Sequence, residues 1–530
     1  MKERIKIKHI KSNVIKIFII TVFSLFLIIP LISIFTNIDK KSISEVFSSP
    51  QFSTALTNSL TVGIISTIIT LIISYLLAMC LERSKIKYKE IWSTIFVLPM
   101  LVPSISHGMG LILLFGNNGF FTNLFDFNLN IYGFKGIVLG SIMYAFPVAF
   151  LMFRDVLKYE DQTPYEAAEI LGLSKIRQFR AITLPYLLKP MISVTFAVFT
   201  MVVTDYGVPL MIGGKYTTIP VLMYQEVIGQ LDFGKGSVYG VILLVPAVIA
   251  FFFDLLKKEK GNSSFITREI ELKENKIVTI GSYFYCFIIS ICVFIPIISF
   301  AVMGFANYYP NDLSFSLKNV IKALDMGAIN FFGNSVLIAL IVSVIGMCFS
   351  LVTAYFTART ESAFSKILHL ISIVSVATPG IVLGLSYVLV FKASFIYGTL
   401  IILVMVNMIH FISSPYLMVY NCLNKINHNL ESVGETLGIS KIRMVKDVII
   451  PQCKLTLCEV FTYFFVNCMI TISAVSFLST NMNKPIALMI NEFEAQMRLE
   501  CAAIVSLAIL IVNILVKLIF ALIKRQIKNN

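Results

Sequence analysis

A phosphate-binding loop is the first chemistry that the sequence offers. Such a loop needs G-x-x-x-x-G-K followed by Ser or Thr, whose hydroxyl reaches the magnesium ion. Gly229 to Lys235 match the first seven positions, but Gly236 takes the place of the hydroxyl residue. We interpret the match as chance, so any ATP hydrolysis has to come from a separate chain.

The other reactive residues do not form the groups that catalysis or metal binding requires. His, Asp and Glu form no cluster at metal-ligand spacing, and the sequence shows no combination of nucleophile, base and metal ligands. The nine cysteines form no C-x-x-C pair and are interpreted as apolar filler. We therefore predict that the chain is not an enzyme and binds no metal or cofactor of its own.

Single ionisable residues within apolar stretches are better candidates. Asp205 stands beside Thr204 and Tyr206, and His107 lies in an earlier apolar stretch. A charge near the centre of a bilayer costs about 2.5–3.5 kcal/mol, so such residues usually have a function. Asp205, Tyr206 and His107 are thus candidates for a polar path. Two alternatives stay open: Asp205 could only cap a helix at the water interface, and His107 could be a packed, hydrogen-bonded residue. Glu459 is a weaker candidate.

The composition places these stretches in a membrane. Of 530 residues, 57% are hydrophobic and 14% charged, against about 25% charged in soluble proteins. A water-soluble enzyme is therefore excluded. Twelve stretches approach the roughly 20 residues that span the hydrocarbon. We predict an all-α integral membrane protein with spans at 17–36, 56–80, 92–115, 136–153, 191–212, 238–256, 278–303, 334–357, 367–391, 396–420, 456–479 and 502–523.

The positive charges predict the orientation of these spans. Lys and Arg number 43, and 33 of them lie at the two termini or in alternate connections between spans. Positive residues are retained on the cytoplasmic side. Both termini are therefore expected in the cytoplasm. The net charge of +14 then needs no nucleic acid to explain it.

The second half of the chain repeats the first. A shift of 276 residues aligns Asn58-Ser59 with Asn334-Ser335, Arg83 with Arg359, Pro103 with Pro379 and Gly108 with Gly384, and a shift of 266 aligns Gly172 with Gly438 and Pro185 with Pro451. Six spans separate the copies, so both insert with the same orientation, as in parallel repeats. We predict a first half at 1–256, a cytoplasmic linker at 257–276 and a second half at 277–530.

The connection at 154–190 is unusually rich in helix signals. Thr163, Pro164 and Glu166 suggest a capped helix start, and Gly172 can end that helix in the left-handed conformation. Ser174 then caps a second helix. We expect a helix, glycine turn and helix outside the membrane, with Ala167 and Ala168 on the surface. A similar connection stands at 421–455. Both could rest on lipid headgroups, but their repetition favours docking to a partner.

At these residues the sequence resembles the membrane permeases of ATP-binding-cassette importers that work with an external binding protein. Their motif is E-A-A, three residues, G, then I-x-L-P, and it stands here as Glu166-Ala167-Ala168-Glu169-Ile170-Leu171-Gly172 and Ile182-Thr183-Leu184-Pro185. The second copy departs from it, with Ser432, Val433 and Gly434 at the E-A-A positions. By resemblance, the residues that couple to an ATPase are Glu166, Ala167, Ala168, Glu169, Gly172, Pro185, Glu435, Gly438 and Pro451.

The resemblance also implies fold, partners and substrates. It implies a type I importer permease fold in which the two connections dock onto two copies of an ATPase subunit that binds ATP and magnesium. An extracytoplasmic solute-binding protein is the other expected partner, in a bacterial plasma membrane. The fused halves are similar to permeases for ferric iron, thiamine and 2-aminoethylphosphonate. Residues 204–214, 225–233 and 240–241 look most like the 2-aminoethylphosphonate group, while ferric iron stays an equal expectation.

Two other classes of membrane protein compete with this interpretation. A secondary transporter can also have twelve spans in parallel halves. It would need several carboxylates or histidines in mid-span, where Asp205 is the one fair candidate in the sequence. An integral membrane enzyme is opposed by the missing catalytic group.

Overall fold

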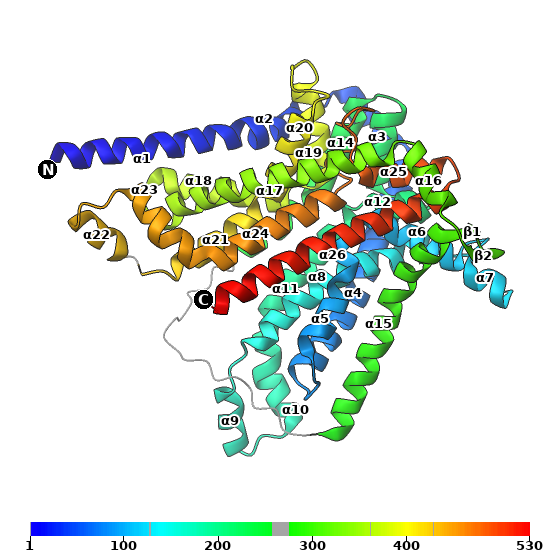
Figure 1. Ribbon diagram of the computed structural model, residues 1–530, viewed down its shortest axis with the longest axis horizontal. Coiled ribbons are helices and arrows are strands. Elements are labelled where there is room, and N and C mark those ends of the chain that lie inside the picture. Colours follow the sequence, from blue (N-terminus) through cyan, green and yellow to red (C-terminus); the bar gives the residue numbers. More distant parts are fainter. Residues whose placement is uncertain (1, 127–128, 257–274, 361, 428, 530) are drawn as a thin grey trace.

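The computed structural model describes residues 2–126, 129–256, 275–360, 362–427 and 429–529, which are mostly helical (Figure 1). Nearly all of the predicted linker at 257–276 lies outside these residues. The first half contains α1 (Lys2–Phe23), η1 (Ser24–Ile28), α2 (Ile29–Thr36), α3 (Lys40–Ser48), α4 (Pro50–Glu82), α5 (Lys89–Val97), η2 (Leu98–Leu101), α6 (Ser104–Phe115), α7 (Phe120–Phe125), α8 (Phe134–Lys158), α9 (Thr163–Ile170), α10 (Lys175–Gln178), η3 (Phe179–Thr183), α11 (Leu184–Val203), α12 (Gly207–Ile212), α13 (Ile219–Tyr224), η4 (Gln225–Gly229) and α14 (Phe233–Leu256).

The second half repeats this order and adds a short antiparallel hairpin of β1 and β2. Its elements are α15 (Lys276–Phe305), β1 (Ala306–Tyr308), β2 (Asp312–Phe315), α16 (Lys318–Asp325), α17 (Ala328–Ala358), α18 (Ala363–Val374), η5 (Ser375–Ala377), α19 (Gly380–Phe391), α20 (Leu400–Phe411), α21 (Ser413–Asn424), α22 (Asn429–Thr436), α23 (Lys441–Met444), η6 (Val445–Ile449), α24 (Ile450–Ile470), η7 (Ile486–Leu488), α25 (Met489–Ala495) and α26 (Leu499–Asn529).

The spans follow the predicted order, but three of them are broken. Within the described residues, nine helices are long and apolar enough to cross a membrane, and three bent pairs bring the number to as many as twelve. The pair α5–α6 bends by 97° and the pair α18–α19 by 110°. Pro103 and Pro379 stand directly before α6 and α19. Because the residue before a proline is driven out of the helical conformation, each proline ends the preceding helix. The predicted spans 92–115 and 367–391 are therefore two half-helices each.

Two further predicted spans end earlier than the hydropathy suggests. The prediction of 191–212 is wrong beyond Val203, where α11 ends, and that of 456–479 is wrong beyond Ile470, where α24 ends. After α11 ends, the chain continues into the short helix α12, and after α24 ends, Thr471 is extended, with φ −67° and ψ 135°. We call these two helix ends the breaks. Apolar residues continue past both breaks because the following segments pack inside the protein. Hydropathy alone cannot distinguish these buried segments from the end of a span.

The sequence repeat corresponds to a structural one. The Ser59 hydroxyl accepts a hydrogen bond from the Ile219 amide at 2.9 Å, and the Ser335 hydroxyl accepts one from the Ile486 amide at 2.7 Å. The preceding asparagine of each half also donates to backbone carbonyls just before that segment. In both halves the second span thus holds the segment that follows the break, at the same place in the fold.

The helices converge at one end of the molecule and diverge toward the other. Figure 1 shows α22 at the left and α9 well separated from it at the bottom, while α6, α12 and α25 lie together at the right. The N- and C-termini lie toward the same side as α9 and α22. We call this side the loop end. Outward-facing positions of α4 are apolar and exposed, including Ile64 (51%) and Ile68 (52%), as expected of a surface that faces lipid.

Candidate functional site: two coupling loops and a cavity between the halves

The connection at 154–190, called the first coupling loop after its expected role, folds as a helix, a glycine turn and a helix, and the connection at 421–455 is called the second coupling loop. Gly172 has φ +67°, the left-handed conformation that glycine adopts without steric cost. The predicted start of α9 is wrong by about one residue, because Thr163 is the first helical residue and Gln162 is the N-cap. Asp161 Oδ1 accepts from the Thr163 amide at 3.1 Å and from its hydroxyl at 2.9 Å. Glu166 instead accepts from Gln162 Nε2 at 2.7 Å.

The surface of this loop is partly apolar. Ala167 is exposed, but Ala168 is only 3% exposed, so the prediction that both alanines face outward is wrong for Ala168. Successive residues of a helix point about 100° apart, so neighbours need not share a face. Ile170 is 87% exposed and Leu171 75% exposed. Glu169, Gly172 and Pro185 are exposed as well.

The second coupling loop has the same shape with different packing. Gly438 has φ +71°, matching Gly172, and Pro451 lies in the first turn of α24. Gly434, at the position of the second alanine, is buried, and a Cβ built on it would lie 2.2 Å from Met444 Cε. The missing methyl group therefore leaves room for Met444. Glu435 lies in α22, and its side chain is outside the described part of the structure.

Arg359 fastens the second coupling loop to the end of α17. Its guanidinium is fully buried and bonds the Glu431 carboxylate at 2.6 and 2.5 Å. It also donates to the carbonyls of Leu423 at 3.2 Å, Ile426 at 2.7 Å and Asn427 at 2.8 Å. Because Glu431 belongs to α22, a single side chain connects the coupling helix directly to a membrane span.

Arg83 connects the first coupling loop to the end of α4 indirectly, through Glu160 and Tyr165. It donates to the Leu157 carbonyl at 2.9 Å and forms an ion pair with Glu160, which precedes the coupling helix. Glu160 accepts from the Tyr165 hydroxyl, which also bonds Thr183 Oγ1 at 2.6 Å. Burial, followed by the bond to Glu160, raises the pKa of Tyr165, so this phenol stays protonated and can donate.

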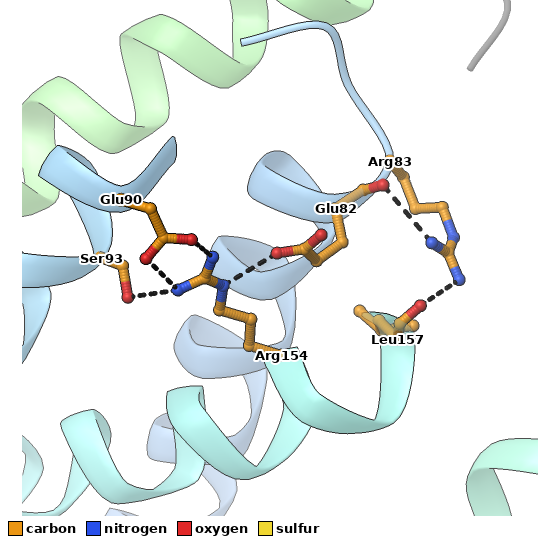
Figure 2. Close-up of polar contacts among 6 residues, drawn as sticks. All are labelled: Glu82, Arg83, Glu90, Ser93, Arg154 and Leu157. Carbon is orange, nitrogen blue, oxygen red and sulfur yellow. Dashed lines mark hydrogen bonds and ion pairs between the residues drawn. The ribbon is translucent and has the colours of Figure 1, made fainter. Parts of the chain in front are cut away.

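Arg154 braces the same end of the first half. Figure 2 shows its guanidinium between two carboxylates, with Glu82 at 2.8 Å and Glu90 at 2.5 Å, and it donates to Ser93 at 2.7 Å. These partners come from α4 and α5, and Arg154 comes from α8. Three span ends are thus tied together beside Arg83, and the base from which the coupling loop projects is rigid.

The second half replaces this ionic cluster with aromatic residues. By the repeat shifts, His369 corresponds to Ser93 and Tyr420 to Arg154. The two rings lie 4.7 Å apart, and His369 Nδ1 is 2.5 Å from the Tyr416 hydroxyl. The two coupling loops therefore have the same shape, but ionic contacts stabilise the span ends beside the first and aromatic contacts those beside the second.

A cavity of about 460 Å³ lies between the halves. Its first wall comes from α8, α11 and α14, and its second from the segments around Pro379 and Ser473. The residues of α11 and α14 that line it lie between the breaks and the loop end, so the cavity extends from the breaks toward the coupling loops. Sequence reasoning missed Tyr144 on the first wall and His410 on the second. A histidine within a predicted span was an available signal for His410.

Asp205 lines this cavity and also caps a helix. Its carboxylate accepts from the Val208 amide at 2.9 Å at the start of α12. The two alternatives left open by the sequence are therefore not exclusive. The capping bond fixes the direction of the chain after α11 ends, and the same residue lines the cavity.

Tyr206 and His107 lie beside the cavity. Tyr206 is 2% exposed, and its hydroxyl donates across the halves to the Ile472 carbonyl at 3.4 Å. Its ring stacks on Tyr224 at 5.3 Å, which in turn stacks on Phe477 at 6.1 Å. These contacts join the halves on the side away from the loop end. His107 is buried, with its ring 6.2 Å from that of Tyr144.

Within the described ranges, no group of three or more His, Cys, Asp or Glu side chains is arranged to hold a metal ion. The nine cysteines are all free. Cys422 and Cys453 approach to 3.1 Å between their sulfur atoms, where two neighbouring spans pack.

Each of the two repeated sets of spans has a projecting loop and a fifth span that ends early, and the segment after each early end lines the shared cavity. This arrangement defines a membrane transport permease. The chain belongs to the family of binding-protein-dependent transport system inner membrane components, whose model matches residues 71–258 and 346–529. It is thus the permease type of ABC importer subunit, an integral membrane component with two fused halves.

Characterised relatives are similar at low identity. A ferric transport system permease protein FbpB of Actinobacillus pleuropneumoniae is 26% identical over 79% of this chain and 63% of its own length. A putative ferric transport system permease protein FbpB 1 of Haemophilus influenzae is 25% identical over 87% of this chain and 77% of its own. A spermidine/putrescine permease PotC homolog of Mycoplasma pneumoniae is 28% identical over 42% of this chain. The chain therefore spans less than two thirds of the Actinobacillus protein.

Proposed function

We propose that this chain is the membrane subunit of an ATP-driven importer that moves ferric iron into the cytoplasm. The loop end faces the cytoplasm, with both termini, and two copies of a separate ATPase dock onto the coupling loops. A binding protein delivers the solute to the opposite end. ATP and magnesium are held by the ATPase. The chain itself then serves as path and gate in a bacterial plasma membrane.

The observation that carries this proposal is the pair of exposed, rigidly anchored coupling loops. Ile170 and Leu171 on the first loop, and Leu437 (70%) and Ile442 (83%) on the second, are largely exposed. Apolar side chains that project beyond the membrane on an anchored helix are typical of a binding surface. The buried guanidinium of Arg359 and the partly buried guanidinium of Arg83 supply the anchorage, so movement of a docked partner would pass into the spans.

Ferric iron is preferred to 2-aminoethylphosphonate because the two relatives described above, each matching most of the chain, are named as ferric permeases. Their identity of about a quarter supports the solute as a proposal. The sulfate and polyamine permeases among the relatives match less than half of this chain.

Reconstitution tests the proposed function. The chain is co-expressed with candidate ATPase and binding-protein partners from the same genome, purified as a complex and placed in proteoliposomes. We expect uptake of ⁵⁵Fe³⁺ from its loaded binding protein to require ATP and to persist when a proton ionophore is added. Uptake that needs no ATP and stops with the ionophore would instead identify a secondary transporter.

A further inference from the structure

We propose that the cavity between the halves is a transit site for a cation, in which Asp205 on one wall and His410 on the other contact the passing solute. This inference rests on the proposed function and names the solute class that the permease itself accepts.

The charges lining the cavity carry the argument. Among the described lining residues, Asp205 is the one with a full charge, and neither lysine nor arginine is present. The remaining polar side chains are hydroxyls, including Tyr144, Thr200 and Thr378, and the imidazole of His410. An anion such as sulfate or a phosphonate would meet a carboxylate here without a cationic side chain to balance it. Burying such an unpaired anion is costly, whereas a cation gains from the same carboxylate.

The N-terminus of α19 brings positive partial charge to the described cavity wall and disfavours a cation there. Gly380 begins this helix and lies on the cavity wall. A helix N-terminus carries roughly half a positive elementary charge, and its effect falls off within one turn. The full charge of Asp205 outweighs it. The N-terminus of α12 is already occupied by Asp205 itself.

The second wall places polar side chains beside the cavity. A Cβ at Gly380 would lie 2.3 Å from Ser473 Oγ and 3.1 Å from His410 Nε2, so glycine is needed for these two side chains to approach. His410 Nδ1 and Thr200 Oγ1 are buried without a hydrogen-bond partner in the described structure. A buried polar atom left unpaired is unfavourable unless a solute or water satisfies it. The imidazole can offer a lone pair to a metal ion or a hydrogen-bond acceptor to an ammonium group.

The site is suited to passage more than to storage. One carboxylate with neutral oxygen and nitrogen donors attracts a cation, yet the described residues contain no group of three or more His, Cys, Asp or Glu side chains that could enclose a metal ion. A pathway site must bind well enough to accept the solute and weakly enough to release it. A hard trivalent ion and a polyamine share this chemistry, and the experiment separates them.

Terbium luminescence measures cation binding at this place. The purified chain is put into nanodiscs of neutral phosphatidylcholine, and Tb³⁺ emission is recorded with excitation of tyrosine. We expect saturable emission that falls in Tyr144→Phe, which removes the phenol in the cavity. Asp205→Asn, which keeps an oxygen to cap α12, should weaken Tb³⁺ binding at least tenfold.

Ala197→Lys is an independent variant, because it adds a positive charge to the cavity wall without touching Asp205, and it should also weaken binding at least tenfold. Glu45→Gln, an exposed carboxylate away from the cavity, is the matched control and should bind as the wild type does. Displacement of Tb³⁺ by Ga³⁺ but not by spermidine would assign a metal ion as solute, and the reverse would assign a polyamine.

The cation site is overturned if Asp205→Asn and Ala197→Lys both bind Tb³⁺ as the wild type does. It is also overturned if equilibrium dialysis finds sulfate or 2-aminoethylphosphonate bound to the wild type and bound more tightly to Ala197→Lys. The proposed function fails separately, if the complete complex shows no ATP-driven uptake of any solute while the chain still binds Tb³⁺ through Asp205.

Discussion

The guanidinium of Arg359 donates hydrogen bonds from two nitrogens to the carboxylate of Glu431 and so connects coupling helix α22 directly to span α17. In the first half the corresponding arginine, Arg83, forms an ion pair with Glu160, which precedes coupling helix α9 in the sequence. The duplicated halves have therefore kept the arginine and moved its acidic partner. Arg359 thus contacts the second coupling helix directly, whereas Arg83 reaches the first coupling helix through Glu160 and Tyr165.

Replacing Arg359 tests this anchorage. Arg359→Ala leaves the partly buried Glu431 carboxylate without its ion-pair partner and the Ile426 carbonyl without the guanidinium donor, so we expect a loss of about 3 kcal/mol in stability. Arg359→Lys should recover only part of it, because an ammonium cannot form the two-point contact. Thermal unfolding of the purified chain measures the loss. Lys41→Ala, which removes an exposed i,i+4 pair with Glu45, is the control and should change stability by less than about 0.5 kcal/mol. Equal effects of the two alanine variants would contradict the anchoring role.

Glu166→Lys should uncouple transport without unfolding the membrane domain. Glu166 lies in the first turn of α9, where its charge and its bond to Gln162 contribute on the order of 1 kcal/mol. That is too little to unfold a dozen spans, but a reversed charge at a docking surface repels the partner. The variant should insert normally and lose at least tenfold in co-purified ATPase. Uptake at the wild-type rate in this variant would rule out docking through Glu166.

The orientation of the loop end is open to direct labelling. Ser174 and Ser440 follow the glycine turns of the two coupling loops and are exposed, as is Asn118 near the opposite end. In a background without native cysteines, cysteines at Ser174 and Ser440 should be protected from an impermeant thiol reagent in intact cells, and one at Asn118 should react. Mass shifts on gels report the labelling. Reaction of the first two from outside would reverse the predicted orientation.

Substitutions at Gly434 and Met444 should have coupled, non-additive effects on stability. Gly434→Ala places a methyl group against Met444 Cε and should destabilise the second coupling loop by about 1 kcal/mol, since a flexible side chain can partly yield. The first loop has Ala168 and Gln178 at the same two positions. Adding Met444→Gln should therefore recover the loss. A double-mutant cycle on thermal stability measures the coupling, and strictly additive effects would show that the two side chains do not interact.

The sequence alone determined the class of this protein and the form of its loops. Hydropathy, charge and repetition are summed over many residues, so membrane insertion and duplicated halves could be predicted with no contact known. The glycine turns at Gly172 and Gly438 were also predictable, because a left-handed residue at a helix end is a local requirement.

Tertiary structure decided where the spans break and what faces the cavity. Val203 and Ile470 end their helices although apolar residues follow, because the next segments are buried inside the protein and not in lipid. Tyr144 and His410 meet one cavity from different halves, and Ala168 turns inward although its neighbour Ala167 does not. These outcomes depend on the rotation and packing of helices that are hundreds of residues apart. No local pattern carries that information, since an apolar residue is equally stable against lipid and against another helix.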